Sequence, residues 1–289
     1  GIRSKNNTTR TKVMVICGPT ATGKTMFGIR LAQKLNGEIV SADSRQVYTG
    51  KNLIYGKDLP ANLKPQVSNL NWRDRYLKYY EIEGVKIWLY DVVKPNESYS
   101  VALWRECAQL VIEDILSRGK LPIVVGGTGL YIKSLTHHLA DISVPRNEIL
   151  RKELADEDAE YLWDYLQQIT PKKMNESDRK NPRRLIRAIE IAQPQKDTPL
   201  NPERSILNTL QIGLTAPKDK LIVRIKKRVR RRKLDASFAA KEINIMKKQL
   251  TWFKKQSHIY WFDISEATWS IQASQLALEW YNEADAKKG

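Results

Sequence analysis

The chain has 289 residues, of which 42% are hydrophobic and 28% charged, a globular composition long enough for one large or two small domains. Its 49 Lys and Arg against 32 Asp and Glu give a net charge of +17, and its two cysteines are too few for a disulfide framework. No apolar run approaches the roughly 18 residues of a membrane span, and residues 1–11 lack the apolar stretch of a secretory signal. We expect a soluble, cytoplasmic monomer with no membrane partner and a flexible basic N-terminus at 1–11.

The positive charge is concentrated in one stretch of the chain. Between Lys218 and Lys255 there are 15 Lys or Arg against 3 acidic residues, and 15 − 3 gives a local charge of +12. Balanced solvated helices alternate the sign of their charges, and this stretch does not. The pattern favours a nucleic-acid-binding surface, with a solvated helix face as the alternative.

Residues 18–25 read GPTATGKT and match the phosphate-loop pattern G-x-x-x-x-G-K-[ST]. They follow the apolar run 13–17 and precede an apolar-periodic segment at 26–35, which is the strand–loop–helix context that the motif requires. Glycines let backbone N–H groups converge on phosphate oxygens, the lysine adds a charge, and the threonine can hold Mg²⁺. The sequence therefore predicts a di- or triphosphate site with Mg²⁺ as cofactor, formed by Gly18, Pro19, Thr20, Ala21, Thr22, Gly23, Lys24 and Thr25.

Strand-like runs alternate with helical patterns along most of the chain. We predict a helix that begins at Gly23, another between Ser100 and Gly119, and strands at 13–17, 38–41, 86–93, 121–125, 210–215 and 259–264. With a phosphate loop after the first strand, this alternation predicts an α/β fold, a P-loop doubly wound parallel sheet. The polar and aromatic stretch 53–80 has no clear period, and we interpret it as loop plus short helix.

The strand pattern is interrupted in the middle of the chain. From Asp141 to about Pro202 the sequence becomes charged and helical, and the strand pattern resumes at Thr209. We therefore predict a helical insertion at 141–204 within a P-loop core formed by 12–140 and 205–289.

Two further polar segments directly follow predicted strands. Asp43 stands in SADSRQVY after the second strand, and Thr128 follows two glycines after the strand at 121–125. Ligands of open parallel sheets bind at the carboxyl ends of the strands, so both side chains should lie beside the phosphate loop. Asp43 then either accepts a proton, helps to organise Mg²⁺ or is an ordinary turn residue. The glycine pair is either a ligand cradle or an ordinary turn.

Together these segments resemble the tRNA dimethylallyltransferase family, also called tRNA isopentenyltransferases. The resemblance covers most of 13–263, with GPTATGKT at 18–25, NGEIVSADSRQVYTG at 36–50, GKLPIVVGGTGLYIKSL at 119–135, NPRRLIRAIE at 181–190 and KKQLTWFKKQ at 247–256. It implies transfer of a dimethylallyl group from dimethylallyl diphosphate to N6 of adenosine 37 in the anticodon stem-loop of tRNA. The phosphate loop would hold the prenyl diphosphate rather than ATP.

The resemblance also implies roles for single residues. The family's general base falls on Asp43, its substrate-contacting threonine on Thr128 and an arginine of the diphosphate crevice on Arg151, while Lys24 would act in catalysis as well as in binding. Contacts with tRNA are implied for three segments: the loop after the second strand, the glycine loop at 126–129, and the insertion. The residues are Asp43, Ser44, Arg45, Gln46, Thr128, Arg151, Arg183, Arg184, Leu185, Ile186 and Arg187.

Two other functions stay open at this point. A free-nucleotide isopentenyltransferase acting on AMP, ADP or ATP would have a similar active site, but a small acceptor gives no reason for the basic stretch. A catalytically impaired RNA-binding relative is the other alternative. From Arg230 the chain reaches the KKQLTW segment in under twenty residues, whereas the family has a longer, tRNA-contacting stretch there.

Overall fold

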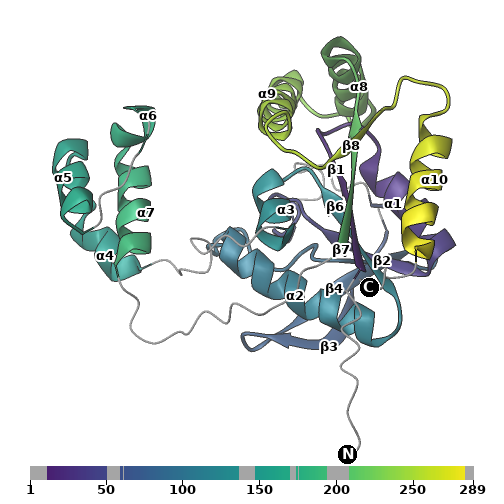
Figure 1. Ribbon diagram of the computed structural model, residues 1–289, viewed down its shortest axis with the longest axis horizontal. Helices are drawn as coiled ribbons and strands as arrows, with labels where there is room; N and C mark the ends of the chain where they lie inside the picture. The colour runs from purple at the N-terminus through teal and green to yellow at the C-terminus, as the bar shows by residue number, and fades with distance from the viewer. Residues whose placement is uncertain are drawn as a thin grey trace, which may run out of the picture. The chain divides into compact units, whose positions relative to one another are not determined.

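The computed structural model describes residues 12–50, 59–60, 62–136, 147–169, 174, 176–193 and 208–283. The chain divides into two compact units, one formed by 1–137 with 205–289 and the other by 138–204 (Figure 1). The second unit begins three residues before the predicted insertion, which was placed at 141–204, and ends at the same residue.

The larger unit is built on one eight-stranded sheet with the order β3-β4-β5-β2-β6-β1-β7-β8. Six of these strands run parallel, and β3 and β4 form an antiparallel edge. The strands are β1 (Lys12–Cys17), β2 (Gly37–Ser41), β3 (Gln66–Trp72), β4 (Arg75–Ile82), β5 (Val85–Trp88), β6 (Leu121–Gly126), β7 (Asn208–Thr215) and β8 (Tyr260–Asp263).

Helices cover both faces of this sheet. On one face lie α1 (Lys24–Leu35) and α10 (Trp269–Asn282), whose buried side chains share a core with Met14 and Ile16 of β1. On the other face lie α2 (Val101–Ser117) and α3 (Gly129–Thr136), which share a core with Val13 and Val15. Alternate residues of β1 thus enter opposite layers, so the doubly wound α/β prediction is confirmed, with an antiparallel edge added.

The antiparallel edge corrects the prediction for 53–80. Its described part is a β3–β4 hairpin rather than a loop with a short helix. The turn is made by Arg73 and Asp74, both with positive φ, at 47° and 65°. Two-residue hairpin turns with positive φ at both positions usually have the sequence Asn-Gly or Asp-Gly, and residues 73–74 have neither. The strand predicted at 86–93 is also shorter, because Leu89 and Asp91 have positive φ and end β5 at Trp88.

A pair of helices follows β7 and carries the basic stretch. Helix α8 (Lys218–Arg231) buries Leu221, Ile225 and Val229 against Met246 of α9 (Ala236–Phe253). Asp235 begins α9 by accepting a hydrogen bond from the Ser237 N–H at 2.8 Å. Basic side chains therefore occupy the faces of α8 that do not contact this core.

Helices are the regular secondary structure of the smaller unit among its described residues. It contains α4 (Glu148–Glu153), α5 (Ala159–Ile169), α6 (Glu176–Arg179) and α7 (Pro182–Ala192). Leu162 and Leu166 of α5 pack against Leu185 and Ile189 of α7. Asn181 begins α7, with proline at the first turn, and its side chain accepts a hydrogen bond from the backbone N–H of residue 184 at 3.3 Å. Across the parts of both units that the structure describes, no helix is long and apolar enough to cross a bilayer.

Candidate active site

The phosphate loop connects β1 to α1 in a tightly packed conformation. Gly18 and Gly23 have φ of 134° and 81°, backbone conformations that favour glycine. A Cβ on Gly18 would lie 2.1 Å from the carbonyl oxygen of Leu214 in the neighbouring strand β7. Inside the loop, the Thr22 hydroxyl donates to the Pro19 carbonyl at 2.9 Å. Packing against β7 and this internal hydrogen bond therefore hold the loop in its conformation, which leads into the N-terminus of α1.

Lys24 is the first residue of α1 and lies half-buried at the loop. Its Nζ donates to the Pro19 carbonyl at 2.7 Å. Burial lowers the pKa of Lys24 to about 8, against the Asp43 carboxylate, which favours the charged form. A bound phosphate would place further negative charge beside this ammonium group and favour its charged form.

A cavity of about 500 Å³ opens beside the loop. Its walls are the phosphate loop with the start of α1, the carboxyl ends of β2 and β6, and one face of α8. Asp43 is among the lining residues, as predicted for a residue at the end of a parallel strand, whereas Thr128 is not and its neighbour Gly127 lines the cavity instead. The cavity therefore brings together the loops after β1, β2 and β6.

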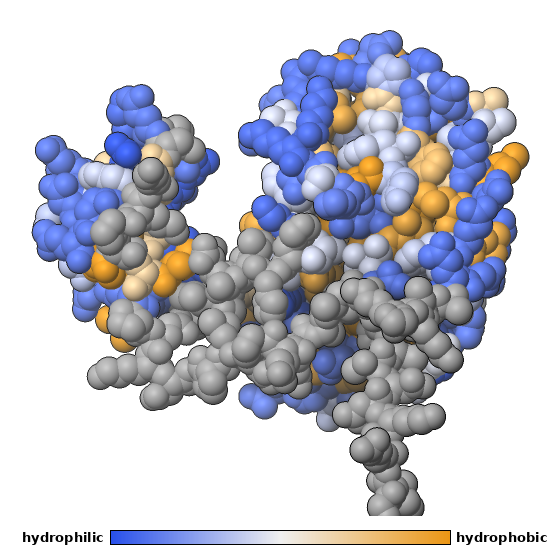
Figure 2. Space-filling model, in the orientation of Figure 1, coloured by the Kyte–Doolittle hydropathy of each residue, from blue (hydrophilic) through white to orange (hydrophobic). Residues whose placement is uncertain are grey.

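Helix α8 supplies the cationic wall of this cavity. Arg224, Lys227, Arg228 and Arg231 line it, and their spacing of three and four residues places them on one helix face. The Arg224 Nε donates to the Ala21 carbonyl at 2.7 Å, and the Arg228 Nη2 donates to the Thr20 hydroxyl at 2.9 Å. The basic stretch is thus divided. This face serves the phosphate-loop cavity, and other basic residues of α8 and α9 contribute to the hydrophilic surface in Figure 2.

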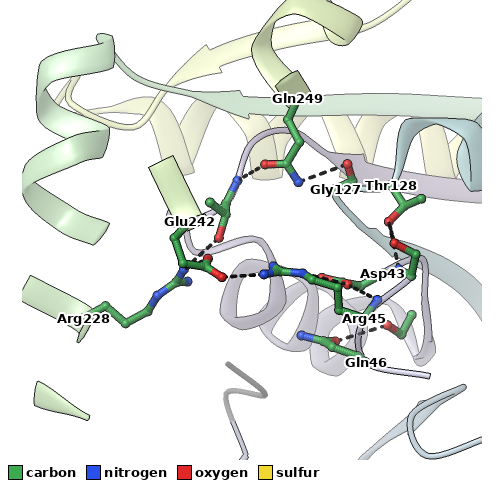
Figure 3. Close-up of polar contacts among 11 residues, drawn as sticks. Asp43, Arg45, Gln46, Gly127, Thr128, Arg228, Glu242 and Gln249 are labelled. Carbon is green, nitrogen blue, oxygen red and sulfur yellow. Dashed lines mark hydrogen bonds and ion pairs between the residues drawn. The ribbon is translucent and has the colours of Figure 1, made fainter. Parts of the chain in front are cut away.

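The loops after β2 and β6 are joined by hydrogen bonds around Asp43 and Thr128 (Figure 3). The Thr128 hydroxyl accepts from the Ser44 N–H at 2.9 Å, and the Thr128 N–H donates to the Ala42 carbonyl at 3.1 Å. Asp43 Oδ1 accepts from the Arg45 N–H at 2.9 Å, and the Asp43 side chain is 19% exposed. Asp43 is therefore held by its own loop while it borders the cavity.

Helix α9 contributes two site residues that the sequence analysis missed. Gln249 accepts from the Thr20 N–H at 2.8 Å and donates to the Gly127 carbonyl at 3.2 Å, so it ties the phosphate loop to the glycine loop. Glu242 lies between two arginines, pairing with Arg45 and, at 2.7 Å, with Arg228 (Figure 3). Gln249 stands inside the KKQLTW segment, and that was the one available signal.

The predicted site residues of the helical unit have partners within that unit. Arg151 forms a two-pronged ion pair with the buried Glu190, at 2.5 and 2.9 Å, and Arg187 pairs with the same carboxylate at 2.9 Å. Burial raises the pKa of Glu190, but hydrogen bonds from both arginines outweigh it and hold the pKa at about 2. Arg184 pairs with Asp178. The roles predicted for these arginines at the diphosphate and on tRNA stay predictions.

Leu185 and Ile186 belong to the hydrophobic core of the helical unit. The Leu185 side chain is buried in the core of the helical unit, so an RNA contact at this position would come from its backbone, and its predicted role stays a prediction. Ile186 is half-buried and packs at the edge of the same core. The apolar face of α7 thus holds α7 in place, whereas Arg183 on the same helix is exposed.

A metal site made of protein side chains alone is absent from the described residues, which contain no group of three or more His, Cys, Asp or Glu that could hold an ion. Thr25 lines the cavity, where its hydroxyl can serve a cation together with a ligand's phosphate oxygens.

Comparison with known proteins gives one consistent result. A family model described as IPP transferase matches residues 77–238, and one described as isopentenyl transferase matches residues 11–77. The tRNA dimethylallyltransferase of Anoxybacillus flavithermus is 32% identical, covering 89% of this chain and 92% of the relative. That of Acetivibrio thermocellus is 41% identical over 75% of this chain and 66% of the relative.

Solved structures agree with these sequence matches. The tRNA isopentenylpyrophosphate transferase of Bacillus halodurans matches with a TM-score of 0.62 and 27% identity, covering 94% of this chain and 97% of the other. A eukaryotic dimethylallyltransferase acting on tRNA shares the fold, with a TM-score of 0.68 at 23% identity over 93% of this chain and 78% of the other. The chain therefore belongs to the tRNA dimethylallyltransferase family, the IPP transferases.

Proposed function

We propose that this protein transfers a dimethylallyl group from dimethylallyl diphosphate to N6 of adenosine 37 in tRNA. The observation that carries the proposal is the cavity itself, which has the phosphate loop, Lys24 and the arginines of α8 on its walls together with a carboxylate, Asp43. A cytoplasmic monomer is the form we propose for the active protein.

The donor's diphosphate fits the cationic part of the cavity. The phosphate loop offers backbone N–H groups and Lys24, and α8 adds Arg224 and Arg228, both already hydrogen-bonded to that loop. As the allylic C–O bond breaks, negative charge grows on the departing diphosphate. Cations fixed beside those oxygens stabilise the transition state more than the bound substrate.

The acceptor chemistry assigns Asp43 the role of general base. The C1–O bond of the donor breaks as a C1–N6 bond forms, and the attacking amine becomes acidic as it gains positive charge. The Asp43 carboxylate takes that proton, and the diphosphate leaves with the electron pair of the broken bond. The hydrogen bonds that link Ser44, Thr128 and Ala42 hold the Asp43 loop against the glycine loop during this step.

Mg²⁺ is proposed as the cofactor, with the Thr25 hydroxyl as its protein ligand. Mg²⁺ commonly takes one or two protein oxygens together with substrate phosphates and water, and Thr25 lines the cavity beside Lys24. When bound, the ion would neutralise charge on the diphosphate. The protein's own contribution is to orient that diphosphate with Lys24 and the α8 arginines.

RNA is favoured over a free nucleotide as acceptor by the charge outside the cavity. Lys226 and Arg230 on α8 and Lys247 and Lys248 on α9 are exposed and do not line the cavity. A mononucleotide bound within the cavity would leave these cations without a ligand phosphate, whereas an RNA backbone that extends beyond the cavity would neutralise them.

The test is a transfer assay with three acceptors under identical conditions. The protein is incubated with dimethylallyl diphosphate, Mg²⁺ and either tRNA, AMP or ATP, and the nucleosides are analysed by mass spectrometry. Dimethylallyl adenosine from tRNA alone supports the proposal, whereas product from AMP or ATP alone would assign a free-nucleotide enzyme. RNA binding without any transfer would leave an impaired relative.

A further inference from the structure

The described residues that line the cavity include more cations than a diphosphate requires and one carboxylate. Among the described residues that line it, Lys24, Arg45, Arg224, Lys227, Arg228 and Arg231 are basic and Asp43 is acidic. Glu242 reaches the same group of side chains from α9.

Glu242 bridges two arginines that come from different parts of the fold. Its Oε1 pairs with Arg45 Nη1, in the loop after β2, and its Oε2 accepts from Arg228 Nη2, on α8, at 2.7 Å (Figure 3). The Glu242 side chain is 12% exposed, so this contact lies largely out of water. Removing one partner of a largely buried ion pair leaves the other charge uncompensated, which favours a move of that charge toward another counter-ion.

Among the described residues, Arg45 has a second ion-pair partner in Asp43. Arg45 Nε lies 3.8 Å from Asp43 Oδ1, and its backbone N–H already donates to the same oxygen. Glu242 holds Nη1 of Arg45, and the closest contact of the guanidinium with Asp43 is the long one made by Nε. A guanidinium that closed on Asp43 would occupy the oxygens needed to accept a proton.

We propose that Glu242 is a positioning residue that holds Arg45 Nη1 on α9 and thereby keeps the ion pair between Arg45 and Asp43 long, so that the Asp43 carboxylate can accept a proton from the acceptor amine. This inference rests on the proposed function, because it needs Asp43 to act as the base. Glu242 itself touches no reacting atom and acts through Arg45.

The same carboxylate has an opposite effect on the diphosphate. Glu242 shares Arg228 with the phosphate loop, since Arg228 Nη2 also donates to Thr20 Oγ1 at 2.9 Å. A negative charge there repels a bound diphosphate and competes for its arginine. Loss of the Glu242 charge should therefore tighten diphosphate binding while it slows chemistry, a pair of effects that a loosened fold would not produce.

The experiment compares the single variants Glu242→Gln and Arg45→Gln with the double variant. Glutamine keeps the size of each side chain and removes its charge. Glu97→Gln, which removes a carboxylate paired with Arg75 outside the cavity, is the matched control. Single-turnover transfer is measured with saturating dimethylallyl diphosphate and tRNA, and inorganic pyrophosphate binding is measured by calorimetry, with circular dichroism as the check on folding.

For Glu242→Gln we expect a transfer rate lower by about 10-fold to 100-fold and pyrophosphate binding tighter by about 3-fold to 10-fold. In the double variant Arg45 is gone and cannot cover Asp43, so the rate should return to that of Arg45→Gln alone. If the wild type is active, two results overturn the assignment of Glu242. One is a double variant as slow as Glu242→Gln. The other is pyrophosphate binding by Glu242→Gln that is unchanged or weaker than that of the wild type. An inactive wild type that still binds pyrophosphate overturns the proposed function, and this assignment with it.

Discussion

Gln249 of α9 accepts a hydrogen bond from the backbone N–H of Thr20, 229 positions earlier in the chain, at 2.8 Å. The amide group of the same side chain donates to the Gly127 carbonyl at 3.2 Å. A Cβ on Gly127 would lie 2.3 Å from this amide nitrogen, so the glycine makes the contact possible. One neutral side chain thus links the phosphate loop to the glycine loop.

We expect Gln249→Ala to weaken pyrophosphate binding by about tenfold, because two backbone groups lose their partner and the phosphate loop loses a support. Calorimetry with pyrophosphate measures this directly. Gln275→Ala on α10, which removes an exposed amide paired with Glu279, is the control and should bind as the wild type does. Equal affinity for the two variants would show that the phosphate loop does not depend on α9.

Asp43→Asn should lower the single-turnover rate by about 10² to 10⁴ while diphosphate affinity changes little. The asparagine amide oxygen can still accept from the Arg45 N–H, so the loop keeps its shape while the base is lost. Asp114→Asn, at an ion pair on α2, is the control. A variant with a normal rate but weaker Mg²⁺ binding would move Asp43 from proton transfer to the metal.

The two faces of α8 should respond differently to salt. Each phosphate neutralised by a cation contributes about 0.7 to 0.9 to the slope of log K against log salt. Lys226→Ala with Arg230→Ala, on the face away from the cavity, should flatten the slope for tRNA binding by about 1.5 and leave pyrophosphate binding unchanged. Arg30→Ala with Lys34→Ala on α1 is the matched control, since both residues are exposed and four positions apart. An unchanged slope in the α8 variant would make this face a solvated surface.

The helical unit should lose stability in acid because of Glu190. Hydrogen bonds from Arg151 and Arg187 outweigh the effect of burial and hold the pKa of Glu190 at about 2, below its usual 4.5. The unfolded chain therefore binds this proton first. The stabilisation, up to roughly 3 kcal/mol, is present above about pH 4.5 and is lost as the pH falls toward 2.

Hydrogen exchange of the α7 amides at pH 6 and pH 3 measures this effect. The wild type should lose protection at pH 3, and Glu190→Gln should be less protected at pH 6 with a smaller further loss at pH 3. Glu176→Gln removes an exposed carboxylate of the same unit and should follow the wild type. The same pH dependence in Glu190→Gln as in the wild type would assign the acid sensitivity to another group.

The fold could be predicted from the sequence where local patterns determine structure. Apolar runs gave the positions of β1, β2 and β6, and the strand–loop–helix context of 18–25 gave the place of the cavity. The β3–β4 hairpin could not be predicted, because Arg73 and Asp74 form its turn without glycine or asparagine. The early end of β5 at Trp88 could not be predicted either, because Leu89 and Asp91 have positive φ although neither is glycine.

The site was predictable up to the contacts that join distant segments. Asp43, Thr128 and the phosphate loop each follow a strand, so their position at one sheet edge follows from topology. Gln249 and Glu242 reach the cavity from α9, and nothing local in the sequence indicates which loop a helical side chain will meet. Helical spacing groups Arg224 with Arg228, but only the packing of α8 shows that this face turns to the cavity.

The most direct test of the central claim is the position of the product on RNA. An anticodon stem-loop with adenosine at position 37, and a matched one with guanosine there, are incubated with the protein, dimethylallyl diphosphate and Mg²⁺. Both are then digested and mapped by mass spectrometry of the fragments. Our account predicts one dimethylallyl group on adenosine 37 of the first RNA and none on the second, with the product lost in Lys24→Ala. Modification of adenosines elsewhere in the loop, or equal modification of both RNAs, would contradict it.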